Sequence, residues 1–273
     1  MQTVLVTGTS SGIGRACVAR FSRAGWRVIA TVRKPDDAAS LLAEFPDITV
    51  LEVELTDAEQ VQRVVGGELA TIGGVDVLVN NAGASIIGAA EEVSLADFRA
   101  QLDINLFAAI QLTQLALPAM RERGKGRIVQ VSSGFGRIAL PMFSAYCASK
   151  YALEGFSEAL AYEVAPFGIE VSLIEPGAVA TQLDNNRREG AGYRARGPYA
   201  GLYKAMRARL SDSHARGGSR ADEVADTIFT AATARRPALR YTVGNMGFAA
   251  ALAARLVPDR LKQVAVGRIT SDR

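Results

Sequence analysis

The sequence predicts a single doubly wound α/β domain, with about seven parallel strands and helices on both faces of the sheet. Short β-rich runs alternate with helical patterns along most of its 273 residues, a length sufficient for one such domain with a sizeable core. The runs 4–6, 77–79 and 171–174 are almost continuously apolar, which is typical of strands buried on both faces. Because strand–helix–strand connections are right-handed, this alternation produces a parallel sheet with helices on each side.

The same patterns place the individual elements along the chain. Strands are expected at residues 3–7, 27–32, 49–54, 75–80, 127–132, 170–175 and 240–243. Helices are expected at residues 12–24, 57–69, 96–120, 144–165 and 221–234. Asp57 and Ser94 stand where the second and third of these helices begin, and both residue types cap helix N-termini.

Two segments fall outside this alternation. Residues 184–219 are rich in Gly and Arg and interrupt the pattern before the last strand, where an insertion would form a lid over the carboxyl ends of the strands. Residues 246–273 form a C-terminal extension, in which Phe248, Leu252 and Leu256 recur at four-residue spacing. We expect this helix face to pack on the domain or on a partner subunit, with a membrane surface as the alternative.

Composition excludes several classes of protein. Apolar residues make up 49% of the chain, which argues against disorder, and no apolar run approaches the roughly 20 residues of a membrane span. One histidine and two cysteines cannot readily build a zinc site, so no metal is expected. The chain begins directly with a strand rather than a signal peptide, and Cys17 and Cys147 lie in predicted helices. We therefore expect reduced thiols and a cytoplasmic protein.

Charge is distributed unevenly along the chain. Residues 1–186 carry 14 basic and 21 acidic side chains, whereas residues 187–273 carry 17 and 7. A basic C-terminal third can attract nucleic acid, anionic lipid or an acidic carrier protein, but it can also be a solvated surface. Because this third has no recognisable motif for reading nucleic acid, we expect no nucleic-acid partner.

A glycine-rich loop, TGTSSGIG at residues 7–14, follows the first predicted strand and opens the first predicted helix. Gly8, Gly12 and Gly14 allow backbone angles that other residues avoid, and they let a phosphate approach the main chain. The helix N-terminus then offers free amides and the positive end of its dipole. This context predicts a dinucleotide phosphate site, to which we also assign Ser10, Ser11 and Ile13.

The end of the second predicted strand indicates which dinucleotide binds. An acidic residue at this edge would accept hydrogen bonds from the adenosine ribose and repel a 2′-phosphate. This chain has Val32 there, followed by Arg33, whose planar guanidinium suits a phosphate. Ser11 could add a hydroxyl group from the glycine loop. The sequence therefore favours NADP(H) over NAD(H).

Tyr146 and Lys150 lie one turn apart on the same face of a predicted helix. An ammonium group beside a phenol stabilises the phenolate and lowers its pKa from about 10. Such a tyrosine can pass a proton to or from an oxygen atom near neutral pH. Together with a dinucleotide site, this pair predicts hydride transfer at a carbon–oxygen bond.

Over residues 1–182 these features resemble the short-chain dehydrogenase/reductase family, in its classical form, which implies a Rossmann-type fold. The resemblance is carried by six segments: the glycine loop 7–14, NNAG at 80–83, Asn105, Ser132-Ser133, Tyr146 with Lys150, and Pro176-Gly177 followed by Thr181.

The resemblance implies a catalytic role for four residues. Tyr146 would exchange a proton with the substrate oxygen, and Lys150 would lower the Tyr146 pKa and hold the nicotinamide ribose. A serine would hydrogen-bond the substrate oxygen. Ser132 and Ser133 both stand at that place, and the family's spacing to the tyrosine selects Ser133. Asn105 would hold a kinked helix open for a water molecule that passes protons to Lys150.

The resemblance also extends the expected cofactor site. Asn81 and Gly83 would lie against the cofactor with mainly structural duties, and Thr181 would bond the carboxamide or pyrophosphate. Where the family usually has an aspartate touching the adenine, this chain has the longer Glu54. The other residues that we assign to the cofactor are Leu55, Ala82, Pro176, Gly177 and Val179, together with Tyr146 and Lys150.

Residues 146–160 and 171–177 resemble the hydroxysteroid and retinol dehydrogenase branch of the family. This implies a small-molecule ketone or secondary alcohol that is bulky and apolar, such as a steroid, retinoid or lipid. The alternatives are reduction of a carrier-bound 3-ketoacyl group and a non-catalytic NADP-sensing protein that binds a partner. The pocket residues that we expect are Ile87, Phe135, Leu140, Phe143 and Tyr193.

The resemblance further implies a homodimer or homotetramer, formed through helices at about 106–120 and 149–165. Candidate contact residues on these helices are Leu112, Leu115, Leu153, Phe156 and Leu160, although some of them must face the sheet.

Overall fold

A seven-stranded parallel sheet forms the centre of the protein, in the order β3-β2-β1-β4-β6-β7-β9. The computed structural model describes residues 1–179, 187–190, 197–215 and 218–270. The strands of the sheet are β1 (Thr3–Val6), β2 (Arg27–Val32), β3 (Thr49–Glu52), β4 (Val77–Asn80), β6 (Gly126–Val131), β7 (Ile169–Pro176) and β9 (Arg240–Val243). This arrangement confirms the predicted fold class. Because the strand order reverses between β1 and β4, a crevice opens at their carboxyl ends.

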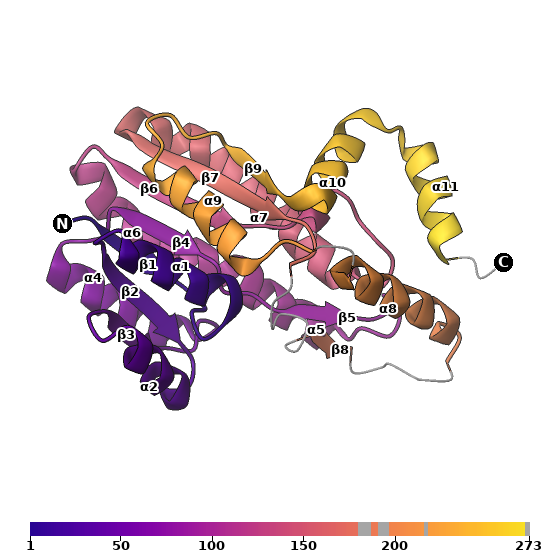
Figure 1. The fold of residues 1–273 in the computed structure, drawn as a ribbon, viewed down its shortest axis with the longest axis horizontal. Helices are drawn as coiled ribbons and strands as arrows, with labels where there is room; N and C mark the ends of the chain where they lie inside the picture. The colour runs from indigo at the N-terminus through magenta and orange to yellow at the C-terminus, as the bar shows by residue number, and fades with distance from the viewer. Residues whose placement is uncertain (180–186, 191–196, 216–217, 271–273) are drawn as a thin grey trace.

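Helices cover both faces of the sheet (Figure 1). One face is covered by α1 (Gly12–Arg23), α2 (Pro35–Glu44) and α9 (Ala221–Thr233). The other face is covered by α3 (Ala58–Val61), α4 (Gly67–Ile72), α6 (Ala108–Glu122) and α7 (Ser144–Val164). The helix α5 (Leu95–Leu102) leads into α6 and contacts α7.

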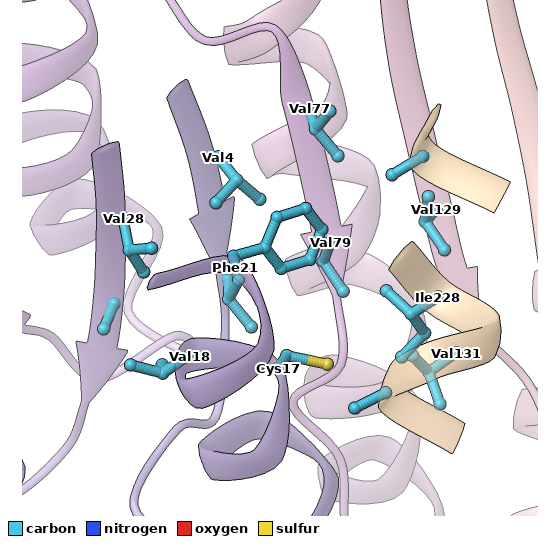
Figure 2. Packing of buried hydrophobic residues seen from close by; sticks show 14 of the residues in the cluster. Val4, Cys17, Val18, Phe21, Val28, Val77, Val79, Val129, Val131 and Ile228 are labelled. Carbon is cyan, nitrogen blue, oxygen red and sulfur yellow. The ribbon is translucent and has the colours of Figure 1, made fainter. Parts of the chain in front are cut away.

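Alternation along the strands divides the core between the two faces. Val4 and Val6 of β1 pack in the cluster under α1, whereas Leu5 between them packs in the cluster under α6. Figure 2 shows the first cluster, in which the ring of Phe21 from α1 lies over β1 and β4. Phe21 is fully buried, and a side chain of this kind contributes about 1.5–3 kcal/mol when it leaves water. This packing fixes the position of α1, and with it the glycine loop that precedes the helix.

Two helices that the sequence predicts as continuous are each widened by a π-helical turn. The predicted helix 57–69 contains η1 (Gln62–Gly66), and the predicted helix 96–120 contains η2 (Asp103–Phe107) between α5 and α6. A π-turn adds one residue to a turn without changing the apolar character of the segment, so periodicity does not reveal it. Such turns are frequent at functional sites, and η2 contains Asn105.

Several elements lie in segments for which the sequence predicted no regular structure. These are α2, α8 (Ala200–Ala215), α11 (Asp259–Thr270), and a two-stranded parallel sheet of β5 (Ser85–Ile87) and β8 (Arg187–Glu189). The helical face expected around Phe248, Leu252 and Leu256 lies in α10 (Gly244–Leu256). The predicted lid, residues 184–219, thus contains β8 and α8 in its described parts. Because β8 pairs with β5, the lid is attached to the segment that follows β4.

The expected subunit contacts need one correction. Leu112, Leu153 and Leu160 are buried within the protomer, where they pack in its apolar clusters, so they cannot form a contact seam. The large side chains that η2 and α7 expose are instead Phe107, Tyr151 and Tyr162. Leu115 and Phe156 are half-buried.

One stretch of the described chain, Leu95–Glu122, is long and apolar enough to cross a membrane by length and composition. In the fold it is the succession α5, η2 and α6, and Leu112, Ala116 and Met120 pack in the core cluster beside the sheet. The segment therefore serves as a core helix of the domain.

Candidate active site

The glycine loop connects β1 to α1 in a tight turn. Gly8 and Gly12 have φ angles of 67° and 55°, which favour glycine, and a Cβ atom on Gly14 would collide with the carbonyl oxygen of Gly8. In the described part of the chain, no side chain caps the first turn of α1. The amides of this turn therefore keep their capacity to bind an anion.

The segment after β4 holds the glycine loop in place. The Asn81 side chain donates hydrogen bonds to the carbonyl oxygens of Thr7 and Gly8, at 2.8 and 3.2 Å. The Thr7 hydroxyl oxygen accepts from the amides of Asn81 and Ala82, each at 2.9 Å. These bonds tie together the carboxyl ends of β1 and β4, where the crevice opens. The side chain of Asn81 thus supports the site, as the sequence indicated.

A cavity of about 690 Å³ runs along this crevice. Most residues that the sequence assigned to the cofactor line it: Gly8, Ser10, Ser11, Gly12, Ile13, Arg33, Glu54, Leu55, Asn81, Ala82, Gly83, Tyr146, Lys150, Pro176, Gly177 and Val179. Of the predicted cofactor and catalytic residues that the structure describes, Gly14 and Asn105 are the two that do not line it, and both support residues that do. Thr181 lies outside the described residues, as does Tyr193.

Tyr146 and Lys150 lie on α7, and both are buried. The Lys150 ammonium nitrogen lies 5.8 Å from the centre of the Tyr146 ring, and it donates a hydrogen bond to the carbonyl oxygen of Val131 at 2.9 Å. Burial lowers the pKa of Lys150 to about 8, against the opposing effect of the Glu154 charge. At pH 7 the group remains mainly an ammonium ion, as stabilisation of a nearby phenolate requires.

Ser132 and Ser133 both line the cavity, immediately after β6. The Ser133 oxygen accepts a hydrogen bond from the Phe135 amide at 3.2 Å, where it caps the short 3₁₀ helix η3 (Gly134–Gly136). Its own O–H thus stays able to donate to a substrate oxygen. The Ser132 oxygen is buried and has no hydrogen-bond partner among the described groups. Both serines can reach the cavity, so the choice of Ser133 stays a prediction.

Asn105 sits in the π-turn η2 and connects three parts of the site. Its oxygen accepts from the Ala84 amide at 2.9 Å, and its nitrogen donates to the Ala84 carbonyl oxygen at 3.1 Å and to the Ser149 hydroxyl at 3.0 Å. A Cβ atom on Gly83 would lie 3.1 Å from the Asn105 oxygen and 3.9 Å from the Lys150 nitrogen. The helix is thus distorted at Asn105 as expected, and the proton path to Lys150 stays a prediction.

At the adenosine end, Arg33 follows β2 and faces Glu54. The closest guanidinium–carboxylate distance is 3.9 Å, and the two side chains are 69% and 40% exposed. A long, exposed contact of this kind is weak, so the guanidinium can turn to another anion. Glu54 also accepts a hydrogen bond from the Thr56 hydroxyl at 2.9 Å. Sequence reasoning missed Asp37, which lines the same end of the cavity from the first turn of α2. The signal was present, because Pro35 followed by two acidic residues is typical of a helix start.

Behind Tyr146 and Lys150 lies a buried pair of carboxyl groups that the sequence reasoning also missed. Glu175 at the end of β7 and Glu154 on α7 are 1% and 5% exposed. Arg137 lies 3.6 Å from Glu175, and Arg240 lies 3.0 Å from Glu154. Burial, and then the Glu154 charge, raise the pKa of Glu175 to about 7 against the effect of the two arginines.

The other end of the cavity is apolar. Phe135, Ile138, Leu140 and Phe143 line it, and the rings of Phe135 and Phe143 lie 6.1 and 6.5 Å from the ring of Tyr146. The side chains that pack around them form one buried cluster: Ile87, Ala89, Met142, Phe143, Tyr146, Cys147, Tyr203 and Met206. Ile87 therefore backs the cavity wall rather than lining it.

The helix α8 covers this apolar end, and two tyrosines fasten it. The Tyr199 hydroxyl donates to Glu91 at 2.6 Å, and the Tyr203 hydroxyl donates to Glu189 of β8. The helix α8 belongs to residues 184–219, and the role of this segment as a substrate lid stays a prediction.

The family model of short chain dehydrogenases matches residues 2–192. The chain belongs to the short-chain dehydrogenase family. It is 32% identical over 273 residues to an NADPH-dependent 3-dehydrocapnine reductase of Ornithobacterium rhinotracheale, with 96% of this chain and 94% of that protein covered. A 3-ketodihydrosphingosine reductase of Bacteroides thetaiotaomicron is 37% identical over 186 residues, covering 68% and 67%.

A solved short-chain dehydrogenase from Streptomyces avermitilis shares the fold, with a TM-score of 0.83 and 34% identity over 98% of both chains. The protein is thus an oxidoreductase that acts on alcohol or carbonyl groups of a small molecule and uses a nicotinamide cofactor. The structure fits such a cofactor, because glycines keep Cβ atoms out of the cradle at the first turn of α1. Ser10–Ile13 would hold its phosphates, and Tyr146 and Lys150 would stand near its nicotinamide end.

Proposed function

We propose that this dehydrogenase reduces a long-chain or otherwise bulky apolar ketone with NADPH. The observation that carries the proposal is the position of Tyr146. Its ring belongs to the apolar cluster at one end of the cavity, while the same cavity runs to the glycine loop at the other end. A hydrophobic carbonyl compound and a dinucleotide would therefore meet beside the Tyr146 phenol.

The bound cofactor supplies the hydride, and the chain's own residues handle the proton. Tyr146 donates its hydroxyl proton to the carbonyl oxygen as the alcohol forms. The ammonium group of Lys150 stabilises the phenolate that remains, and the Ser133 hydroxyl donates a hydrogen bond to the same substrate oxygen. Oxidation of an alcohol would use the same groups in reverse order.

The preference for NADPH rests on Arg33. Its guanidinium is exposed and lines the adenosine end of the cavity, where only the weak contact with Glu54 engages it among the described ion pairs. A 2′-phosphate would offer a stronger, two-pronged partner. The relative from Ornithobacterium rhinotracheale, which is named as NADPH-dependent, supports this choice.

A cofactor titration tests the preference. Arg33→Ala should raise the Kd for NADPH about 10–100-fold, because a charge-assisted pair is lost, and should leave the Kd for NADH nearly unchanged. Lys34→Ala is the matched control, since Lys34 is also basic and exposed but does not line the cavity. Equal losses for both cofactors would contradict a phosphate contact.

A substrate panel tests the reaction class. The panel contains 3-ketodihydrosphingosine, which one relative's name indicates, a steroid ketone, a short aliphatic ketone and a carrier-bound 3-ketoacyl group. We expect NADPH consumption with the long-chain ketone at a kcat/KM well above that of the short one. Turnover of the carrier-bound group alone would favour the carrier alternative. Tight NADPH binding without turnover of any compound would favour a cofactor-sensing protein.

We also propose a cytoplasmic homodimer or homotetramer. Cys17 and Cys147 are buried free thiols, which suits a reducing compartment. The exposed side chains Phe107, Tyr151 and Tyr162 on η2 and α7 offer an apolar contact surface. Light scattering of the purified protein tests the oligomeric state, and fractionation of the source cells tests the cytoplasmic location.

A further inference from the structure

The helix α10 has two unlike faces. Ala249, Ala250 and Ala253 line the cavity on one side. On the other side Phe248, Leu252 and Leu256, four residues apart and thus on one stripe, are 62%, 47% and 67% exposed. An exposed apolar stripe is unfavourable in water, so its presence indicates that α10 does more than complete the cavity wall.

The apolar surface continues on the next helix. Leu261 and Val264 of α11 are 60% and 52% exposed. In Figure 1 α11 stands out from the body of the protein, and it contacts α8, the helix that covers the apolar end of the cavity. The exposed surface of α10 and α11 therefore adjoins both a wall and the cover of the cavity.

The charges beside this surface are basic. Arg255 is exposed and adjoins Leu256 on α10, and Arg260 is exposed and adjoins Leu261 on α11. Lys262 forms an ion pair with Asp259 at 3.1 Å, so these two charges offset each other. Exposed aliphatic and aromatic side chains flanked by arginines match the interface of an anionic bilayer, where the apolar groups enter the acyl region and the arginines meet lipid phosphates.

We propose that α10 and α11 bind the surface of an anionic membrane, with the cavity opening toward the lipid from which its substrate comes. The helices lie on the membrane and do not cross it. This partner goes beyond the proposed reductase function, and it is testable without cofactor or turnover, so failure of one proposal does not imply failure of the other.

The test is co-sedimentation of the full-length protein with vesicles. One set contains phosphatidylglycerol and phosphatidylcholine in equal parts, and the other contains phosphatidylcholine alone. We expect the wild type to bind the anionic vesicles at least about tenfold more strongly than the neutral ones. Phe248→Ser/Leu252→Ser/Leu256→Ser should abolish binding to both, and Arg255→Glu/Arg260→Glu should weaken binding to anionic vesicles about tenfold or more.

Controls separate docking from folding. Leu95→Ser removes an equally exposed leucine, 72% exposed, at the start of α5 and should leave vesicle binding unchanged. Circular dichroism reports whether the triple variant is folded. If it is not, Phe248→Trp keeps an apolar ring in place, and its fluorescence should shift to shorter wavelength with anionic vesicles and be quenched by brominated lipid.

Three outcomes would overturn the proposal. The wild type could fail to bind anionic vesicles at low salt, or the folded triple variant could bind as well as the wild type. Alternatively, the wild type could fail to bind vesicles while the triple variant has a lower molar mass than the wild type in light scattering. That result would assign this surface to contact with a second copy of the chain.

Discussion

This dehydrogenase has two regions with different roles, namely the residues up to Gly177 and the C-terminal third. The first region holds the glycine loop, Tyr146 and Lys150, and main-chain hydrogen bonds or buried contacts fix each of them. The second region contributes a cover, α8, and a wall of alanines from α10, and it carries an excess of basic residues. The contrast indicates that the sheet and α7 fix the proton-transfer pair, while α8 and α10 add to the cover and the wall of the cavity.

After the loss of the Tyr146 hydroxyl, the largest expected effect also lies in the first region and concerns Ser133, the serine expected to bind the substrate oxygen. Ser133→Ala should lower kcat about 10²–10³-fold for every ketone, short or long, because a donor to the developing oxyanion is lost. Ser132→Ala is the matched control and should retain most activity. Steady-state kinetics with NADPH measure both. The reverse ranking of the two variants would show that the family's spacing selected the wrong serine.

A smaller effect is expected in the second region, and only for long substrates. Ala253→Phe places a ring in the cavity from α10, so KM for a long-chain ketone should rise about tenfold while kcat/KM for a short ketone changes little. Ala251→Phe, on the same helix but not lining the cavity, is the control. Equal losses for long and short ketones would remove the distinction between the two regions.

The smallest expected effect concerns the buried acid pair behind the site. Glu175 keeps its proton up to about pH 7 in the folded state, whereas its ordinary pKa is 4.5. Between these values the folded chain binds more protons than the unfolded one, so this group makes stability fall as pH rises through that window. Between pH 4.5 and 7.5, the urea concentration at the unfolding midpoint should therefore fall by several tenths of a molar more for the wild type than for Glu175→Gln.

Glu170→Gln, on the same strand but partly exposed, is the control for this measurement. Its urea midpoint should follow that of the wild type at both pH values. If the difference in urea midpoint between Glu175→Gln and the wild type does not change with pH, the Glu175 carboxyl group is ionised throughout this range.

The two regions also differ in how much of their structure the sequence could predict. Buried parallel strands have a distinctive apolar pattern, and the glycine loop and the Tyr146–Lys150 pair are encoded at short spacing, so the sheet and the centre of the site follow from local residues. The distortion at Asn105 was expected through family resemblance alone, because the apolar period continues through η2.

What could not be predicted depends on contacts between distant segments. Glu154 and Glu175 meet only because α7 packs on β7, and the pairing of β5 with β8 joins residues about a hundred positions apart. The seam leucines Leu112, Leu153 and Leu160 show the same difficulty. The sequence of a long amphipathic helix reveals an apolar face, but the fold determines which neighbouring element covers that face.

In the proposed reaction the Tyr146 hydroxyl supplies the proton, while the rest of the cavity binds the reactants. The most direct test is Tyr146→Phe, measured for both turnover and NADPH affinity. We predict a loss of at least about 10²–10⁴-fold in kcat with the best ketone of the panel, and a Kd for NADPH within a few-fold of the wild type. A variant that binds NADPH normally and keeps most of its kcat would contradict the account.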